Sequence, residues 1–404
     1  MAAAAALLTA VTACSADGDP ATTPTALTPS TSTPPTTAAP PASAASTTTA
    51  ISSVPPASAA APTTAPVDSA RQTLLRGILE SHRAAGEFVG ARIALREPDG
   101  TIIEVTSGTK AVDPASGPVD PNVPWNIGSA TKTFVAVVVL QLADEGRIDL
   151  DAGIDRFFPD LPGADRITPR QLLQHTSGLG EYINQPAVVN DPRQEWTPAE
   201  LIAVAETAGR VGEPGGPHSY TNTNYIVLGE IIEQVSGNPW ADEVGTRIAT
   251  PLGMTHTSLI ADERPIGYEL VDGTFVDATY SADPSVGGAA GALQSTGRDL
   301  LLFATALANG TLLSPESQAA MRAFVPAEDL SQFGILHGYG LGLEQYATDS
   351  ITVNGHMGTG EAQSAYVGYD VDRGTAVAVM TNVAIPGPQA IIAVETLLAV
   401  NASG

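Results

Sequence analysis

The sequence predicts an α+β fold. We expect one antiparallel sheet built from both chain ends and flanked by helices, with an all-helical subdomain inserted at about residues 113–325. Two observations predict this. Strand patterns occur at residues 89–95 and 101–106 and return only at 351–354, 362–369 and 375–382. Between the two groups the apolar spacing is helical or irregular. A cleft is expected where the sheet meets the helical insertion.

The other elements follow in chain order. An amphipathic helix is expected at residues 68–85, and the turn sequence Pro-Asp-Gly at 98–100 joins the first two strands into a hairpin. Further helices are expected at residues 169–174, 198–208, 225–235, 240–248 and 297–308, and a last apolar helix at 389–400.

The first 66 residues differ from the rest, since they are almost wholly Ala, Thr, Ser and Pro, with no aromatic residue. Such a segment cannot bury a core. A short apolar run precedes Val-Thr-Ala-Cys at residues 11–14, which resembles a bacterial lipobox. We therefore expect a lipoprotein-type signal peptide at 1–13, lipidation of Cys14, a tether at 14–66 and a folded domain at 67–404. The protein is then exported, and is either anchored by lipid to the outer face of the bacterial cytoplasmic membrane or secreted. The alternative is an unstructured N-terminus with a stray cysteine, because the basic residues of a signal peptide are missing.

Composition excludes several classes of site. The 404 residues include 18 basic and 43 acidic side chains, a formal charge of −25 that disfavours nucleic acid as a partner. Cys14 is the only cysteine, so no intramolecular disulfide or zinc-thiolate site is possible. The histidines are scattered, no metal or cofactor motif is present, and a Gly-x-Ser-x-Gly elbow is absent.

The stretch at residues 125–146 carries the main candidate site. Ser129 and Lys132 stand three apart, so on a helix the hydroxyl and the amine share one face. Residues 134–142 are apolar all round except Gln141, which predicts a helix buried on every side and ending near Gly146. Burial can lower the pKa of a lysine by about three units, enough for a base at neutral pH. The backbone N–H of Ser129 could also serve an oxyanion hole.

A second Ser-x-x-Lys pair, Ser107 and Lys110, has the same spacing. The prolines and glycines at residues 113–118 prevent a helix there, so we interpret this pair as a loop after a strand. His175 precedes a Thr-Ser-Gly turn and is interpreted as structural.

Two further stretches carry polar groups suited to a site. Tyr220 and Asn222 come just before an apolar helix; a tyrosine can relay a proton, and an asparagine can hold both a lysine and a substrate amide. Near the C-terminus, glycines around His356 let a strand backbone approach a ligand closely. Either stretch alone would be ordinary loop or turn chemistry.

Taken in order, Ser-x-x-Lys, Tyr-x-Asn and the His-Met-Gly-Thr-Gly stretch resemble the motifs of the penicillin-recognising serine hydrolases. The resemblance is greatest to the branch of class C β-lactamases, D-Ala-D-Ala carboxypeptidases and related esterases. It extends over essentially residues 67–401 and includes the stretches 172–179, 224–229, 290–296 and 339–342. It implies the α+β fold described above, no cofactor, and an acyl-enzyme mechanism.

By position, the resemblance makes Ser129 the acylated nucleophile and Lys132 with Tyr220 the proton-transfer pair, without deciding which of the two is the base. Asn222 would orient the substrate and Lys132. The substrate would also meet His356, Gly358 and Thr359, with the N–H groups of Ser129 and Thr359 as the oxyanion hole.

One departure concerns the substrate. Met357 stands where relatives that bind a free carboxylate usually carry threonine, and no Lys or Arg lies between residues 339 and 355, where Glu344 and Asp349 occur instead. Three hypotheses remain open. The first is a hydrolase of cell-wall peptides or β-lactams, similar to D-Ala-D-Ala carboxypeptidases; the second is an esterase on small neutral esters. The third is a non-catalytic protein that binds peptidoglycan or β-lactams.

Overall fold

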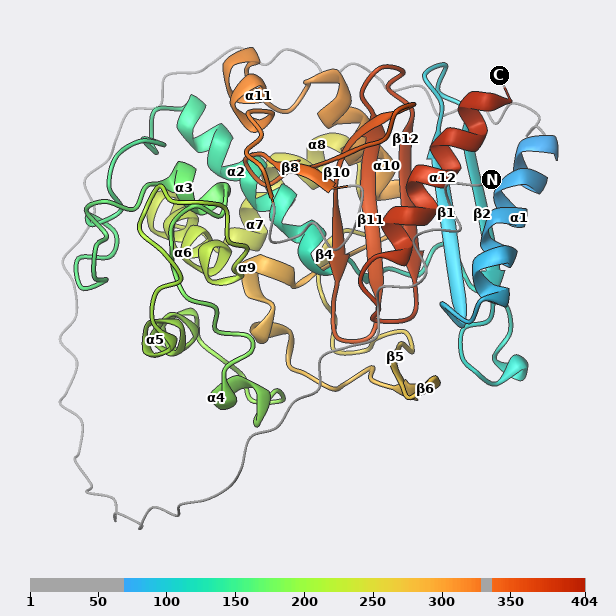
Figure 1. The fold of residues 1–404 in the computed structure, drawn as a ribbon, viewed down its shortest axis with the longest axis horizontal. Helices are drawn as coiled ribbons and strands as arrows, with labels where there is room; N and C mark the ends of the chain where they lie inside the picture. Colours follow the sequence, from blue (N-terminus) through green and yellow to red (C-terminus); the bar gives the residue numbers. More distant parts are fainter. Residues whose placement is uncertain (1–68, 328–335, 404) are drawn as a thin grey trace, which may run out of the picture. The chain divides into compact units, whose positions relative to one another are not determined.

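A seven-stranded antiparallel sheet, in the order β2-β1-β12-β11-β10-β9-β8, organises the part of the chain that the computed structural model describes, residues 69–327 and 336–403 (Figure 1). Its strands are β1 (Gly90–Arg96), β2 (Ile102–Gly108), β8 (Leu336–Tyr339), β9 (Glu344–Ala347), β10 (Thr352–Thr359), β11 (Ser364–Asp370) and β12 (Ala376–Thr381). β1 pairs with β12, so the prediction of one sheet from both ends is confirmed. The predicted signal peptide, Cys14, the tether and the boundary at residue 67 lie outside the described residues.

Helices cover both faces of this sheet. Val377 and Val379 of β12 are fully buried in the core formed with α1 (Ser69–Ala84) and α12 (Pro388–Ala402). The residues between and beside them, Ala376, Ala378 and Met380, belong to the second core, formed with α10 (Gly297–Asn309). Because successive side chains of a strand point to opposite faces, a strand covered on both sides is apolar throughout. Figure 1 shows α1 and α12 beside one another over the β1–β12 end of the sheet.

The inserted part contains the remaining helices and turns. The helices are α2 (Thr131–Asp144), α3 (Pro169–Leu173), α4 (Pro186–Val189), α5 (Pro198–Ala208), α6 (Thr223–Ser236), α7 (Trp240–Val244), α8 (Thr250–Leu252), α9 (Gly288–Gly291) and α11 (Pro315–Met321); the shorter turns are η2 (Pro114–Ser116), η3 (Gly128–Ala130), η4 (Gly245–Ala249) and η5 (Pro284–Val286). α2 is the central one: residues 134–140 are all fully buried, as the unbroken apolar run predicted. None of the helices in residues 69–327 and 336–403 is both long and apolar enough to cross a bilayer.

The insertion also holds short strands that the sequence pattern did not reveal. They are β3 (Trp125–Asn126), β4 (Ser258–Leu259), β5 (Tyr268–Val271), β6 (Thr274–Asp277) and β7 (Leu293–Ser295). Strands of two or three residues, such as β3, β4 and β7, are too short for a period of two to appear. In the main sheet, β10 continues five residues beyond the predicted end at residue 354, because its glycine-rich half still pairs with β11, as in His356 with Val367.

Candidate active site

Ser129 lies in the 3-10 turn η3, immediately before α2 rather than in its first turn. Two glycines bring the end of β10 against this turn. A Cβ at Gly128 would lie 2.6–2.7 Å from the backbone of Thr359, and a Cβ at Gly358 would lie 1.9 Å from the Ile127 carbonyl and 2.8 Å from the Ser129 nitrogen. Any larger residue would separate the two backbones. The close approach places the backbones of Ser129 and Thr359 side by side.

The Lys132 amine is buried and makes three hydrogen bonds. Its Nζ lies 2.9 Å from Ser129 Oγ, 2.8 Å from Asn222 Oδ1 and 2.8 Å from the carbonyl oxygen of Ala290. A carbonyl oxygen can only accept a hydrogen bond. In the neutral amine, Asn222 and Ala290 therefore take both Nζ hydrogens, and the lone pair is directed at the Ser129 hydroxyl.

Glu181 determines the orientation of Asn222 that this arrangement needs. Its Oε2 accepts hydrogen bonds from the Asn222 backbone N–H at 2.8 Å and from Nδ2 at 3.0 Å. Because a carboxylate only accepts, Nδ2 faces Glu181 and Oδ1 faces Lys132. Glu181 stands three residues after Gly178 of the Thr-Ser-Gly turn, but nothing in the sequence around it distinguishes it from a surface carboxylate.

Burial changes the acidity of both candidate proton-transfer groups. Desolvation lowers the pKa of Lys132 to about 7, although the carboxylates of Glu181 and Glu344 partly oppose it. Desolvation also raises the pKa of Tyr220 well above its usual value, while a hydrogen bond with Ser129 lowers it to a smaller extent. Near neutral pH the amine can therefore lose its proton, whereas the phenol keeps its own.

His356 is placed differently from the other candidate residues. Its ring is fully buried and does not contact the cavity beside Ser129. Nδ1 lies 2.5 Å from the Met357 carbonyl oxygen, so Nδ1 carries the hydrogen and Nε2 accepts from the Tyr339 hydroxyl at 2.8 Å. Desolvation lowers the pKa of His356 to about 3, and the ring is neutral. The expectation that His356 meets the substrate directly is therefore not supported by its position.

The same chain of hydrogen bonds continues to His175. Tyr339 donates to His356 and so can accept from His175 Nε2, 3.3 Å away. His175 Nδ1 then accepts from the backbone N–H of Thr221 at 3.3 Å and from the Asn224 amide at 3.0 Å. A single arrangement of hydrogens therefore satisfies His356, Tyr339 and His175 together. This buried chain ties the loop that carries Tyr220 and Asn222 to the sheet, as the structural interpretation of His175 expected.

Glu344, the acidic residue noted in place of a carboxylate anchor, is also buried. It accepts hydrogen bonds from the Met357 N–H at 2.7 Å and from the Tyr346 hydroxyl at 2.6 Å. Desolvation raises its pKa to about 7. Its carboxylate therefore holds the backbone of β10 and does not contact the cavity.

The cavity in front of Ser129 has a volume of about 400 Å³. Asn222, Thr359 and Gly360 line it, as do Gly287, Ala290 and Gly291. Its charged lining residues are Glu269 and Glu361; no Lys, Arg or His of the described chain contributes to the lining. Glu361 accepts a hydrogen bond from Asn126 at 2.9 Å, and burial raises its pKa.

Within residues 69–327 and 336–403 no group of three or more His, Cys, Asp or Glu side chains could hold a metal ion. The titratable groups that hydrogen-bond to Ser129 are Lys132 and Tyr220.

Comparison with known proteins identifies the family. The family model described as Beta-lactamase matches residues 75–401. This chain belongs to the β-lactamase family. Solved members of similar fold include the D-amino acid amidase of Ochrobactrum anthropi SV3 in complex with D-phenylalanine, with a TM-score of 0.76 and 28% identity over 83% of this chain and 100% of that one.

Among curated relatives in the β-lactamase family, penicillin-binding protein 4 of Amycolatopsis lactamdurans is 28% identical over 63% of this chain and 71% of its own length. Penicillin-binding protein 4* of Bacillus subtilis is 30% identical over 46% of this chain and 40% of its own. The chain thus spans about half the length of the curated relatives it matches. The membership confirms the resemblance and the fold class inferred from the motifs.

Proposed function

We propose that this chain is a serine hydrolase that works through an acyl-enzyme, with Ser129 as the nucleophile. The observation that carries the proposal is the 2.9 Å contact between Ser129 Oγ and a buried amine whose pKa is lowered to about 7. A serine hydroxyl becomes reactive when an adjacent base accepts its proton. The membership of the β-lactamase family supports the same mechanism.

In the proposed reaction, Lys132 Nζ accepts the Oγ proton while Oγ bonds to the acyl carbon. The carbonyl electrons move onto the oxygen, which the N–H groups of Ser129 and Thr359 stabilise. The tetrahedral intermediate expels the leaving group, which takes the proton from Lys132 by way of the Tyr220 hydroxyl. Water then attacks the acyl-enzyme ester, and Lys132 and Tyr220 again transfer the proton. This step releases the carboxylic acid and restores the Ser129 hydroxyl.

We assign the base to Lys132 rather than Tyr220 because their pKa values shift in opposite senses. A base of pKa about 7 is partly free at neutral pH and is still strong enough to accept a proton. Forming the phenolate of Tyr220 would cost far more, since burial raises its pKa. Asn222 keeps the lone pair of Lys132 directed at Ser129.

The charge of the cavity supports one substrate class. Glu269 and Glu361 line it without a cationic partner in the lining, so a substrate carboxylate would be repelled. An acyl donor with a free ammonium group would be attracted. We therefore propose amides or esters of amino acids with a free amino group as substrates, in line with the similarity to a D-amino acid amidase. Carboxylate-bearing β-lactams and D-Ala-D-Ala peptides are the second candidate, favoured by the penicillin-binding relatives.

Labelling tests the mechanism. A fluorophosphonate should label the wild type and not Ser129→Ala; labelling of neither would favour the non-catalytic alternative. A panel of D-phenylalanine amide, N-acetyl-D-phenylalanine amide, p-nitrophenyl acetate, nitrocefin and a D-Ala-D-Ala peptide then tests the substrate class. Faster turnover of D-phenylalanine amide than of its N-acetyl derivative supports our proposal. Turnover of p-nitrophenyl acetate alone supports the neutral-ester hypothesis. Preference for nitrocefin or the D-Ala-D-Ala peptide supports the β-lactamase or carboxypeptidase hypothesis.

Glu361→Gln tests the role of this carboxylate in substrate binding, with p-nitrophenyl acetate as the uncharged control substrate. It should raise KM for D-phenylalanine amide about tenfold, the value of one charge contact of about 1.4 kcal/mol, and leave KM for p-nitrophenyl acetate unchanged. An equal effect on both substrates would show that Glu361 acts on the fold of the cavity and not on the ammonium group.

For localisation we propose an exported protein anchored by a lipid on Cys14. The support is the lipobox-like stretch and the similarity to penicillin-binding proteins. Mass spectrometry of the mature N-terminus tests this: a diacylglyceryl cysteine at Cys14 would support it, and an unmodified Cys14 would exclude it.

A further inference from the structure

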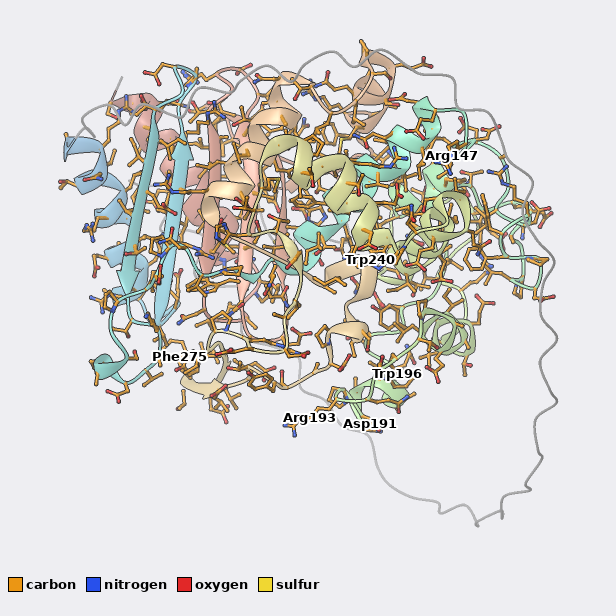
Figure 2. All side chains as sticks on the ribbon, turned by 180° about the vertical axis from the view of Figure 1, so that it is seen from behind. Arg147, Asp191, Arg193, Trp196, Trp240 and Phe275 are labelled. Carbon is orange, nitrogen blue, oxygen red and sulfur yellow. The ribbon has the colours of Figure 1, made fainter. Side chains whose placement is uncertain are left out.

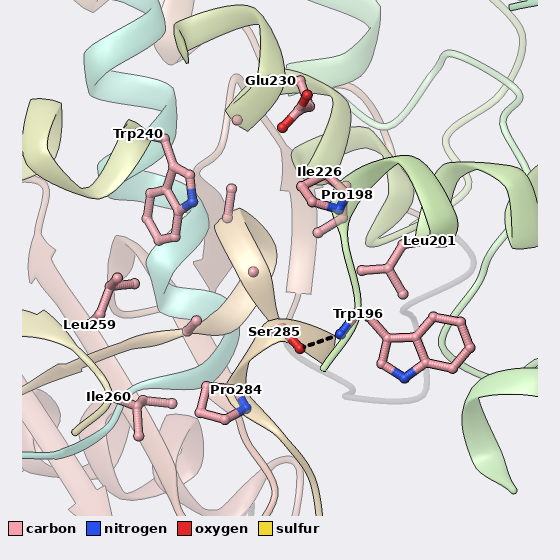
Figure 3. Close-up of a pocket in the computed structure, with 14 residues that line it drawn as sticks. Trp196, Pro198, Leu201, Ile226, Glu230, Trp240, Leu259, Ile260, Pro284 and Ser285 are labelled. Carbon is pink, nitrogen blue, oxygen red and sulfur yellow. Dashed lines mark hydrogen bonds between the residues drawn. The ribbon is translucent and has the colours of Figure 1, made fainter. Parts of the chain in front are cut away.

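A second cavity lies behind the wall of the first. It has a volume of about 280 Å³ and lies between α5, α6, α7 and the segment at residues 284–292 (Figure 3). Pro284, Ser285, Gly288, Ala289 and Ala292 of that segment line it.

The same segment also lines the cavity in front of Ser129, through Val286, Gly287, Ala290 and Gly291. The Ala290 carbonyl oxygen, on that other side, accepts the hydrogen bond from Lys132. The two cavities are thus separate sites that share one wall, and the second contains none of the residues assigned above to the reaction.

The lining of the second cavity is aromatic and aliphatic. Two of the three tryptophans in the sequence, Trp196 and Trp240, contribute to it, with Leu201, Ile226 and Ile260. Figure 3 shows the two indoles on opposite sides of the cavity, and Figure 2 shows Trp240 and Trp196 from the opposite side of the molecule to Figure 1. Gly229 lets α6 pack closely against α9 at the cavity, since a Cβ at Gly229 would lie 2.7 Å from that of Ala289. The Trp196 backbone is held by a 2.8 Å hydrogen bond to Ser285 Oγ.

One charged group lines this apolar space. Glu230 of α6 lies at one end of the cavity in Figure 3, away from Pro284 and Ile260. Burial and the neighbouring Glu233 raise its pKa, and within the described part of the chain no cation or hydrogen bond lowers it. A half-buried carboxylate of this kind is stabilised by a cation. The charge of −25 on the chain also attracts cations to the surface.

We propose that the cavity between Trp196, Trp240 and Glu230 is a binding site for a small apolar ammonium compound. The ammonium group would pair with the Glu230 carboxylate and contact the indole faces, since a cation is attracted to the face of a tryptophan ring. The apolar part would fill the space bounded by Leu201, Ile226 and Ile260. Pockets that are mostly apolar with a few polar groups that orient the ligand are typical of small-molecule sites.

Benzyltrimethylammonium is a suitable probe, because it carries a permanent charge and cannot donate a hydrogen bond. For a ligand of this size we expect a Kd of about 0.1–1 mM. The chain labelled with 5-fluorotryptophan should give three fluorine signals, and those of Trp196 and Trp240 should shift on titration, whether or not the probe also enters the first cavity and shifts that of Trp125. Trp125 precedes Asn126 of the first cavity, so a shift of its signal alone would place the probe there and overturn the proposal.

Charge-neutral variants separate pairing from apolar contact. Glu230→Gln should weaken probe binding at least tenfold, while benzyl alcohol binds wild type and variant equally. Glu233→Gln is the matched control: it removes a nearby charge outside the lining, and its amide oxygen can still accept the Trp240 backbone N–H. It should change Kd less than twofold. Equal binding of the probe to wild type and Glu230→Gln, or no saturable shift in the wild type, would overturn the proposal. Circular dichroism of each variant verifies its fold.

Discussion

The chain contains two Ser-x-x-Lys pairs, which differ in what their side chains contact. Ser129 and Lys132 span the turn η3 and the start of α2, and their side chains meet at 2.9 Å. Ser107 lies in β2, where its hydroxyl donates a 2.8 Å hydrogen bond to Glu80 of α1, and Lys110 follows the strand and is exposed. On a helix, residues three apart share a face, whereas along a strand they point to opposite faces. The same spacing therefore brings the two side chains together at the start of a helix and directs them apart along a strand.

Burial separates the two pairs further. Lys132 is fully buried, and its three hydrogen-bond partners come from three different segments. Ser107 is buried against a single helix. A reactive pair thus requires a backbone that brings the groups together and a desolvated setting that lowers the pKa of the amine.

The largest expected effect comes from removing the hydroxyl of each pair. Ser129→Ala should lower kcat by at least about 10³-fold, because the covalent step is lost. Ser107→Ala should leave kcat within about twofold, since this hydroxyl donates its hydrogen bond to Glu80 of α1 and not to a group of the candidate site. Turnover of the best substrate of the panel measures both. A Ser107→Ala chain as inactive as Ser129→Ala would contradict the distinction.

The two lysines should differ nearly as much. Lys132→Met should lower kcat by about 10²- to 10⁴-fold, the usual contribution of general acid–base catalysis. Lys110→Met should have no effect on turnover. In the wild type, the deprotonated amine is the active form, so kcat/KM should rise with pH and level off above about 7. A pH profile that is flat from pH 5 to 9 would exclude Lys132 as the base.

Stability provides an independent check on Lys132. The pKa of Lys132 in the folded chain, about 7, lies below the usual lysine value of 10.5, so between these values the unfolded chain binds more protons. The free energy of unfolding of the wild type, relative to Lys132→Met, should therefore rise with pH across this window. Urea denaturation at several pH values measures the difference, and a constant difference would contradict the burial of a titrating amine.

A smaller effect is expected from a glycine beside each pair. An alanine at Gly358 would clash with the Ile127 carbonyl, and one at Gly108 would clash with the Val89 carbonyl at 2.0 Å. Both changes should reduce the free energy of unfolding by about 1–3 kcal/mol. Only Gly358→Ala should also lower kcat, by about 10²-fold, because it separates Thr359 from Ser129. Kinetics and thermal denaturation of the two variants test this; equal kcat values would contradict the close approach.

The smallest effect concerns the structural role of Ser107. Ser107→Ala should cost about 1 kcal/mol of unfolding free energy, the usual value of one hydrogen bond to a partly solvated carboxylate. A double-mutant cycle with Glu80→Gln measures the coupling. Additive effects of the two changes would show that the hydrogen bond contributes nothing.

The fold was largely predictable because its elements are long and strongly patterned. The helix at 198–208 and the hairpin of β1 and β2 appear where the periodicity indicated them, within one or two residues. The strands β4 and β7 did not, since they pair with each other across a distance that no local pattern shows. The hairpin of β5 and β6 was missed although the turn sequence Asp272-Gly273 joins its strands, and β8 and β9 have only four residues each.

For the candidate site, the sequence by itself determined the chemical groups: a serine and a lysine three apart, a tyrosine and an asparagine before a helix, and glycines at the end of a strand. Only the tertiary structure decided which of them meet. It brings Lys132 to Ser129, Asn222 and Ala290, adds Glu181 to orient the asparagine, and directs His356 into a buried chain of hydrogen bonds away from the cavity. The reason is physical: spacing along the chain specifies which groups share an element, whereas desolvation and contact between distant segments depend on how those elements pack.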